Sequence, residues 1–175
     1  MRPILILCVL LLFQSCSWLG SKGVILQRPL QKPYKVAVII VQDEVFESSE
    51  SISESDFFTK ILAEELSKKN IFRYTILNRK YSLQSFDHFQ ASLLGIELMD
   101  QYDAYLVCIP KRKGLNYRIE LRLYQSNPTA QLISVRHNSS LGNSYWFYQP
   151  PEGTLMDATR GAVDLLDSKI KKALR

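Results

Sequence analysis

The side chains of this sequence that could do chemistry are two histidines, a cysteine in an apolar run and a cluster of carboxylates. A nucleophilic pair would require Cys108 beside His88 or His137, because a base must lie within hydrogen-bonding reach to activate a thiol. Cys108 stands between Val107 and Ile109, and apolar neighbours favour burial as a small core residue. We therefore expect no catalytic residue and no enzymatic activity. The remaining alternative is a hydrolase that lacks a recognisable motif.

The carboxylates crowd one stretch of the chain, where Asp43, Glu44, Glu47 and Glu50 lie among serines. Such a loop could hold Ca²⁺, but the spacing matches no calcium loop such as the EF-hand. Two histidines and three cysteines cannot furnish a zinc finger, and the chain has no Gly-rich phosphate loop. The sequence predicts a solvated acidic loop, no metal site and no cofactor.

Two groups of residues could bind a partner. The first is a basic group formed by 111–113 (Lys-Arg-Lys) with Arg118, Arg122 and Arg136. These side chains could lie on a solvated sheet surface or contact anionic polymers or lipid headgroups. The second is an aromatic cluster just before a Pro-Pro-Glu-Gly turn, and it consists of Tyr145, Trp146, Phe147 and Tyr148. An edge strand that buries alternate rings explains this cluster, while the other rings could face a protein partner.

The N-terminus has the pattern of an export signal. Met1-Arg2 is a short basic start, and the ten residues 4–13 are all apolar, which is too short to span a bilayer unaided. Residues 13–16 (Phe-Gln-Ser-Cys) resemble a lipobox, after which a bacterial lipoprotein is cut and acylated on its cysteine. We therefore expect a signal peptide over 1–15 and a lipid (palmitate) on Cys16. The alternative is a plain secretory signal, cut between Ser15 and Gly20, with Cys16 incidental.

Length and composition bound the rest of the chain. With 175 residues, 46% hydrophobic and 22% charged, the chain fits one globular domain and excludes wholesale disorder or a fibrous protein. We expect a tether over 16–33, where glycines and prolines recur, and a single domain over 34–175. The net charge of +5 is mild, and we expect no nucleic-acid partner for an exported protein. Because Cys8 leaves with the signal, an acylated Cys16 makes Cys108 the last thiol, and no intrachain disulfide can form.

Periodicity predicts the elements that must position these residues. A continuous β-branched run at 35–41 indicates a strand buried on both faces. An S-x-x-D signal at 53–56 begins an amphipathic helix that ends near Asn70. The alternation over 116–124 marks a strand with one core face and one polar face. We expect further strands over 72–77, 103–109 (stopped by Pro110) and 132–135, and further helices over 83–99 and 154–174. The order β-α-β-α-β-β-β-α predicts an α/β fold, with a mixed sheet and flanking helices in two or three layers.

Several of these strings resemble a known family. Residues 35–38 followed by the acidic loop, 57–79 (FFTKILAEELSKKNIFRYTILNR), 102–107, 117–123 and 157–174 are similar to periplasmic lipoproteins with the fold of the TolB N-terminal domain. That group includes the penicillin-binding-protein activator, FlgO-type and curli-assembly lipoproteins. Pro110 stands where the group often has Gly, and 127–130 (Asn-Pro-Thr-Ala) replaces its usual Thr-Gly turn.

The resemblance implies a non-enzymatic accessory or assembly factor in the cell envelope. Such a protein would be anchored by its N-terminal lipid in the cell envelope. We expect it in the outer membrane, on the side that faces the periplasm, where it would bind an envelope protein. The alternative is an oligomeric structural component of a secretion, flagellar or surface assembly.

Overall fold

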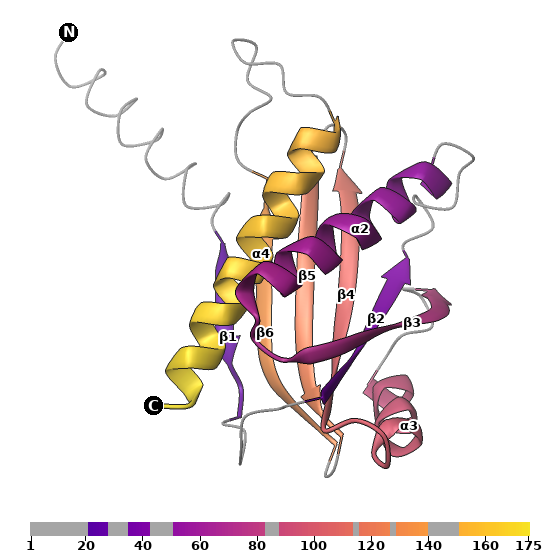
Figure 1. Cartoon of the computed structure of the whole chain (residues 1–175), viewed down its shortest axis with the longest axis vertical. Helices are drawn as coiled ribbons and strands as arrows, with labels where there is room; N and C mark the ends of the chain where they lie inside the picture. The colour runs from indigo at the N-terminus through magenta and orange to yellow at the C-terminus, as the bar shows by residue number, and fades with distance from the viewer. Residues whose placement is uncertain are drawn as a thin grey trace, which may run out of the picture.

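The structure is a computed structural model that describes residues 21–27, 35–42, 51–82, 88–113, 116–126, 129–139 and 151–175. These residues form one six-stranded sheet and three helices (Figure 1). In chain order the elements are β1 (Lys22–Ile25), β2 (Lys35–Gln42), α2 (Ser51–Lys69), β3 (Arg73–Ser82), α3 (His88–Leu98), β4 (Ala104–Lys113), β5 (Asn116–Gln125), β6 (Ala130–Asn138) and α4 (Pro151–Ala173).

The sheet is mixed, with the strand order β1-β6-β5-β4-β2-β3. The strands β3, β2 and β4 run parallel, because helices connect them, whereas β4, β5, β6 and β1 pair antiparallel. The predicted α/β fold with a mixed sheet is therefore confirmed.

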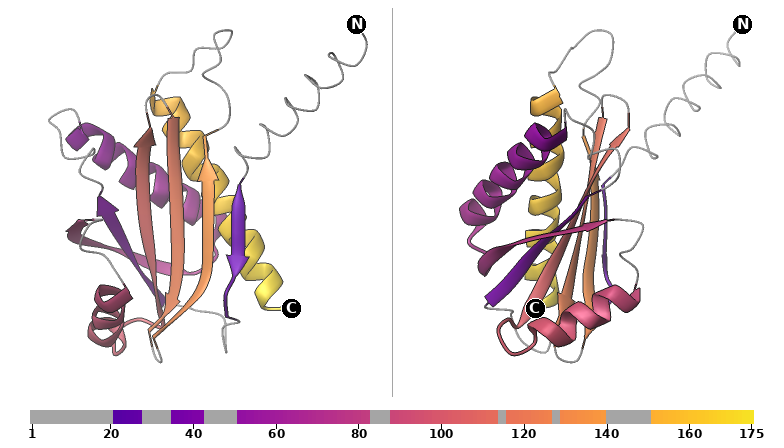
Figure 2. Two further views of the ribbon diagram at one scale, coloured as in Figure 1. Left: turned by 180° about the vertical axis from the view of Figure 1, so that it is seen from behind. Right: turned by 90° about the vertical axis from the view of Figure 1, so that its right-hand side faces the viewer.

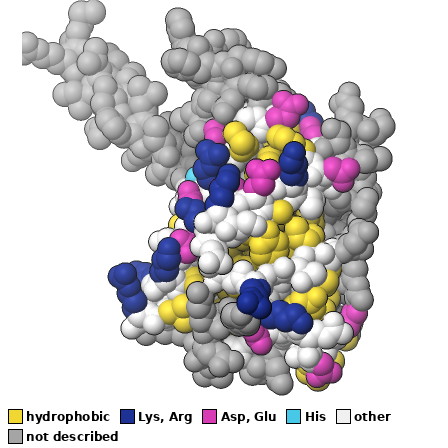
Figure 3. All heavy atoms as spheres, in the orientation of Figure 1, with side chains coloured by type: hydrophobic (Ala, Val, Ile, Leu, Met, Phe, Trp, Pro, Cys, Tyr) yellow, Lys and Arg dark blue, Asp and Glu magenta, His cyan; other side chains and the backbone are white. Residues whose placement is uncertain are grey.

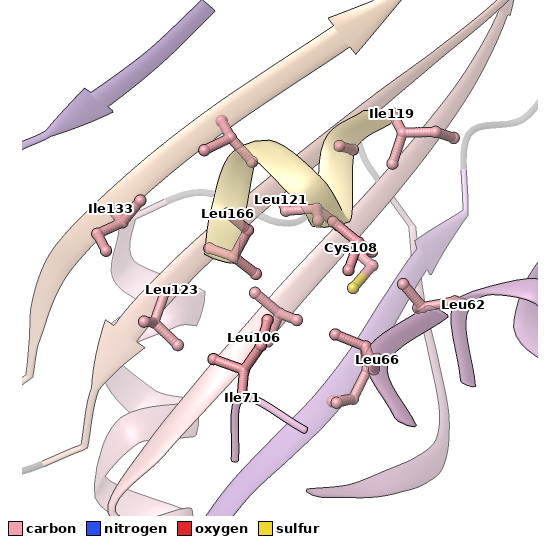
Figure 4. Close-up of a cluster of buried hydrophobic side chains, with 14 of the residues drawn as sticks. Leu62, Leu66, Ile71, Leu106, Cys108, Ile119, Leu121, Leu123, Ile133 and Leu166 are labelled. Atoms are coloured by element: carbon pink, nitrogen blue, oxygen red, sulfur yellow. The ribbon is translucent and has the colours of Figure 1, made fainter. Parts of the chain in front are cut away.

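One face of the sheet, the helical face, is covered by α2 and α4 (Figure 2). Their apolar stripes bury Leu62, Leu66 and Leu166 against Cys108 and Leu121 of the sheet (Figure 4). Burial of such side chains is the main source of stability for a domain of this size. The expected helix end at Asn70 is confirmed, since this residue adopts a left-handed conformation with φ 47°.

Of the described helices, α3 alone lies on the opposite face, the back face, where it crosses one end of the sheet (Figure 2). This helix packs Ala91, Leu94 and Leu98 against the sheet, and the buried Tyr105 hydroxyl donates a hydrogen bond to the Ala91 carbonyl oxygen at 2.6 Å. Gly95 lets α3 approach the β5–β6 turn, because a Cβ there would lie 2.3 Å from Thr129 Oγ1. Among the described residues, α3 thus forms a third layer at one end of the back face.

The structure corrects two boundaries. Strand β1 lies inside the stretch 16–33 that we expected to be a tether, and it pairs with β6 at the edge of the sheet. Strand β4 continues through Pro110, because its pairing with β2 ends at Cys108 and the residues beyond have a neighbour only on the β5 side. The described part of the helix predicted over 83–99 is α3 (His88–Leu98), and residues 83–87 of that prediction lie outside the described residues.

Candidate functional site

Cys108 and His137 lie on different strands, and both side chains pack within the fold. Cys108 is fully buried in β4, and burial raises the pKa of its thiol, which disfavours the nucleophilic thiolate. His137 lies in β6, with β5 between the two strands, so two strand spacings of about 4.8 Å separate them. The thiol and the imidazole therefore do not form a nucleophile–base pair.

The His137 ring packs against Gly161 of α4, where an added Cβ would lie 2.2 Å from Nε2. Its Nδ1 hydrogen bonds the Ser21 hydroxyl, which immediately precedes β1. Burial lowers the pKa of His137, and the negative charges of Asp164 and Asp157 only partly oppose this effect. His137 of β6 is therefore a neutral packing residue that contacts both α4 and the residue preceding the edge strand β1.

Several predicted site residues lie outside the described residues. These are Cys16, the aromatic cluster Tyr145, Trp146, Phe147 and Tyr148, and the acidic loop residues Asp43, Glu44, Glu47 and Glu50. His88 begins α3, but its side chain is not described. Each of these interpretations stays a prediction.

The structure divides the predicted basic group between the two faces of the sheet. Arg112 lies on the helical side, where its Nη1 pairs with Glu54 of α2 at 2.8 Å and its guanidinium lies 5.9 Å from the ring centre of Tyr117. Lys111 is the neighbouring residue and points to the back face, as the alternation of a strand requires. Lys111 is directly opposite Arg118 in the register of β4 and β5.

Five cations come together on the back face. Lys22 of β1 is directly opposite Arg136 of β6, and Arg136 is opposite Glu120 of β5. We call this group the basic sheet face, and it consists of Lys22, Lys111, Arg118, Arg122 and Arg136. It comprises four of the residues that the sequence singled out and adds Lys22. The antiparallel register, which sequence alone could not supply, creates it.

Glu120 is the one acidic residue in the sequences of β1, β4, β5 and β6. It is 5% exposed and accepts hydrogen bonds from Arg122 Nε at 2.8 Å and Nη2 at 2.7 Å. Burial alone would lower the pKa of Arg122, but the hydrogen bond and charge of Glu120 raise it above its ordinary value. Arg122 is thus fixed as a cation, while Lys22, Arg118 and Arg136 are exposed.

The helical face has a different charge pattern. Helices α2 and α4 together carry eight acidic and seven basic residues. Opposite charges alternate over this side of the molecule (Figure 3), and some form ion pairs between the helices, such as Lys69–Asp164 at 2.5 Å and Arg160–Glu65 at 3.5 Å. Charge is therefore balanced on the helices of the helical face, whereas β1, β4, β5 and β6 bring the five cations of the basic sheet face together with one carboxylate, Glu120, on the back face.

Exposed apolar side chains mark two places. On α3, Leu93, Ile96 and Met99 just beyond its end are 45%, 60% and 43% exposed and recur every three residues. At the sheet edge, Val24 of β1 and the following Leu26 are 53% and 56% exposed. Each place puts large apolar side chains in contact with solvent, which is a feature of interaction sites when such residues are contiguous.

Neither a metal-binding cluster nor a membrane-spanning helix occurs among the described residues. No three or more His, Cys, Asp or Glu side chains in this part of the chain are grouped so as to hold a metal ion. No described helix combines the length and the apolar character that crossing a bilayer requires.

Sequence reasoning missed Lys22 and Val24 because the glycines and prolines of the lead indicated a tether. The signal that could have found them is the aliphatic run 24–26 (Val-Ile-Leu) after Gly23. A run of this kind is short but is typical of an edge strand.

Comparison with known proteins defines the class of fold. No protein-family model matches this chain, and no curated protein is significantly similar to it in sequence. Among solved structures, it is similar to the PelC dodecamer from Paraburkholderia phytofirmans, with 12% identity and a TM-score of 0.53 over 83% of this chain and 97% of that chain. A dodecamer of a PelC point variant gives 13% identity and a TM-score of 0.50 over 89% and 98%.

TolB from Acinetobacter baumannii is also among the similar structures. It has 14% identity and a TM-score of 0.43, over 89% of this chain and 31% of TolB. The fold of this chain is thus similar to that of PelC, and at these identities the likeness concerns the fold alone.

Proposed function

We propose that this chain is a non-enzymatic envelope lipoprotein that acts as an accessory or assembly factor by binding other protein chains. The observation that carries the proposal is the exposed apolar side of α3, formed by Leu93, Ile96 and Met99. A short helix that buries one side against the sheet and leaves three large apolar side chains in water is suited to contact a protein. The burial of Cys108 and the packing of His137 favour a role without catalysis.

A second candidate function is favoured by the comparisons. PelC, whose fold is similar, forms a dodecamer. Under this alternative, copies of the chain bind one another and form a structural component of an envelope assembly. The same exposed side of α3 would then contact a second copy.

The lipid anchor is the part of the proposal that the N-terminal sequence supports. It is tested by acyl labelling and membrane fractionation of the wild type and Cys16→Ala. Label and membrane sedimentation are both lost in Cys16→Ala if the anchor is real. A wild type that is unlabelled and recovered in the periplasm contradicts the anchor.

The binding role is tested by in-cell crosslinking and sedimentation of the detergent-extracted protein. The variant Ile96→Glu places a charge on the exposed side of α3, and Met156→Glu is the matched control on α4, where Met156 is 37% exposed. If the chain is an accessory factor, it crosslinks to a different protein, and Ile96→Glu abolishes this crosslink. If copies of the chain bind one another, the wild type sediments as a large species, and Ile96→Glu dissociates it. Unchanged behaviour of Ile96→Glu contradicts the proposal that α3 is the contact.

A further inference from the structure

The basic sheet face has features that packing does not explain. Two of its like-charge pairs, Lys22–Arg136 and Lys111–Arg118, are directly opposite in register. Like charges directly opposite on neighbouring strands destabilise a sheet. Glu120, the one carboxylate in the sequences of β1, β4, β5 and β6, is already bonded to Arg122. We propose that this face binds the surface of a bilayer that contains anionic phospholipid.

The position of the face agrees with such a contact. It lies on the side of the sheet that α2 and α4 leave open, and at the end away from α3 (Figure 2). Strand β1 starts at that same end with Lys22, a member of the face. Five residues separate Cys16 from Lys22, so a fully extended chain between them spans at most about 20 Å. This step rests on the proposed lipid anchor, because a lipid on Cys16 would hold the face close to headgroups.

The composition of the face favours a bilayer over a soluble anionic polymer. Val24 shares the row of Ser134 and Arg122 in the register of β1, β6 and β5, and its side chain is 53% exposed. Leu26 adds a second exposed aliphatic group beyond β1. Cations next to aliphatic groups are the combination that binds at a membrane interface, where headgroups meet acyl chains. A polysaccharide would use the cations but leave the aliphatic groups in water.

The test is co-sedimentation of the full chain with vesicles of phosphatidylcholine containing 30% phosphatidylglycerol, compared with phosphatidylcholine alone. All proteins carry Cys16→Ser, so none of them has an acyl chain. Differences in vesicle binding are therefore independent of whether the lipid-anchor proposal is correct. The apolar run at 4–13 contributes equally to every sample and is measured by the neutral vesicles.

The test variant is Lys22→Gln, Arg118→Gln, Arg136→Gln. The matched control, Lys60→Gln, Lys172→Gln, Arg175→Gln, removes the same charge from exposed positions on α2, α4 and the C-terminus. Near an anionic surface each cation contributes about 1 kcal/mol, so the test variant should bind the anionic vesicles roughly 100-fold more weakly. The control should change by less than about threefold, and thermal unfolding verifies that both variants fold.

Three outcomes overturn the proposal. Equal losses in both triple variants would show only a dependence on net charge. Binding of dextran sulfate by the wild type, without a preference for anionic over neutral vesicles, would assign the face to a polymer. A wild type whose binding to anionic vesicles does not weaken as salt increases from 50 to 500 mM would also contradict an electrostatic contact, even if the triple variant fails to fold.

Discussion

The two faces of the sheet come from the same strands, whose side chains alternate between them, yet the two surfaces differ in cover and charge. The helical face is closed by α2 and α4, and its outer surface balances eight acidic with seven basic residues. The back face is covered by α3 at one end, and at the other end the described strands carry the five cations of the basic sheet face and a single carboxylate, Glu120. The helical face therefore supplies stability, whereas the back face retains unfavourable charge pairs that an external ligand can neutralise.

The largest effect should come from a cavity under α4. Leu166 is fully buried against the sheet, so Leu166→Ala should lower the free energy of unfolding by about 2–5 kcal/mol. The binding of the folded protein to anionic vesicles should stay unchanged. Urea unfolding measures the loss, and Met156→Ala on the exposed side of α4 is the control, with a change below about 0.5 kcal/mol. A cost under 1 kcal/mol for Leu166→Ala would contradict the role of the helical face.

The next effect concerns the single carboxylate of the back face. Glu120→Gln leaves Arg122 without its charged partner, and we expect it to lower the free energy of unfolding by about 1–3 kcal/mol. The same change makes the face more positive, so binding to anionic vesicles should increase by about fivefold. Arg122→Gln is the matched variant and should lower both stability and binding. The account is contradicted if the two variants change vesicle binding in the same direction.

Two neighbouring residues test the division between the faces. Lys111→Gln removes a cation from the back face and should weaken binding to anionic vesicles by about fivefold. Arg112→Gln removes the same charge from the helical side, where Arg112 pairs with Glu54, and should change binding by less than about twofold. Vesicle co-sedimentation of the two single variants makes the comparison, and equal losses would mean that the faces do not differ in this respect.

The smallest effect is a pH dependence centred on His137. Burial lowers the pKa of His137 below its ordinary value of 6.5, so the unfolded chain binds a proton at a higher pH than the folded chain. The stability that the neutral ring contributes is therefore full above about pH 6.5 and is lost as the pH falls through the lower folded value. Thermal unfolding at pH 7.5 and 5.5 should show a greater loss for the wild type than for His137→Gln. A greater loss for the variant would show that protonated His137 is the stabilised form.

The sequence was sufficient for the fold where periodicity was strong. The alternation over 116–124 predicted β5 and its two faces, and the apolar steps of the C-terminal helix predicted α4. It failed where a short run depends on a distant partner, as in β1, which has four residues and pairs with β6 more than 100 residues later. Pro110 indicated a strand end because sequence does not show that β2 stops pairing before it.

The basic sheet face was only partly predictable, because it also depends on the pairing of strands that are distant in the sequence. Arg118 and Arg122 could be placed together from the period of one strand, but the positions of Lys22 and Arg136 beside them depend on the register of two strand pairs. Lys111 and Arg112 are adjacent in the sequence and read there as one basic cluster, but their side chains lie on opposite faces of the sheet.

The most direct test of the difference between the faces is fluorescence quenching on a bilayer. The full chain with Cys8→Ser and Cys16→Ser retains the buried Cys108, and a fluorophore is attached through either Arg136→Cys on the back face or Lys172→Cys on α4. Vesicles contain phosphatidylglycerol and lipids with a nitroxide in the headgroup. The account predicts strong quenching of the label at 136 and little quenching of the label at 172. Equal quenching of the two labels, or stronger quenching at 172, would contradict it.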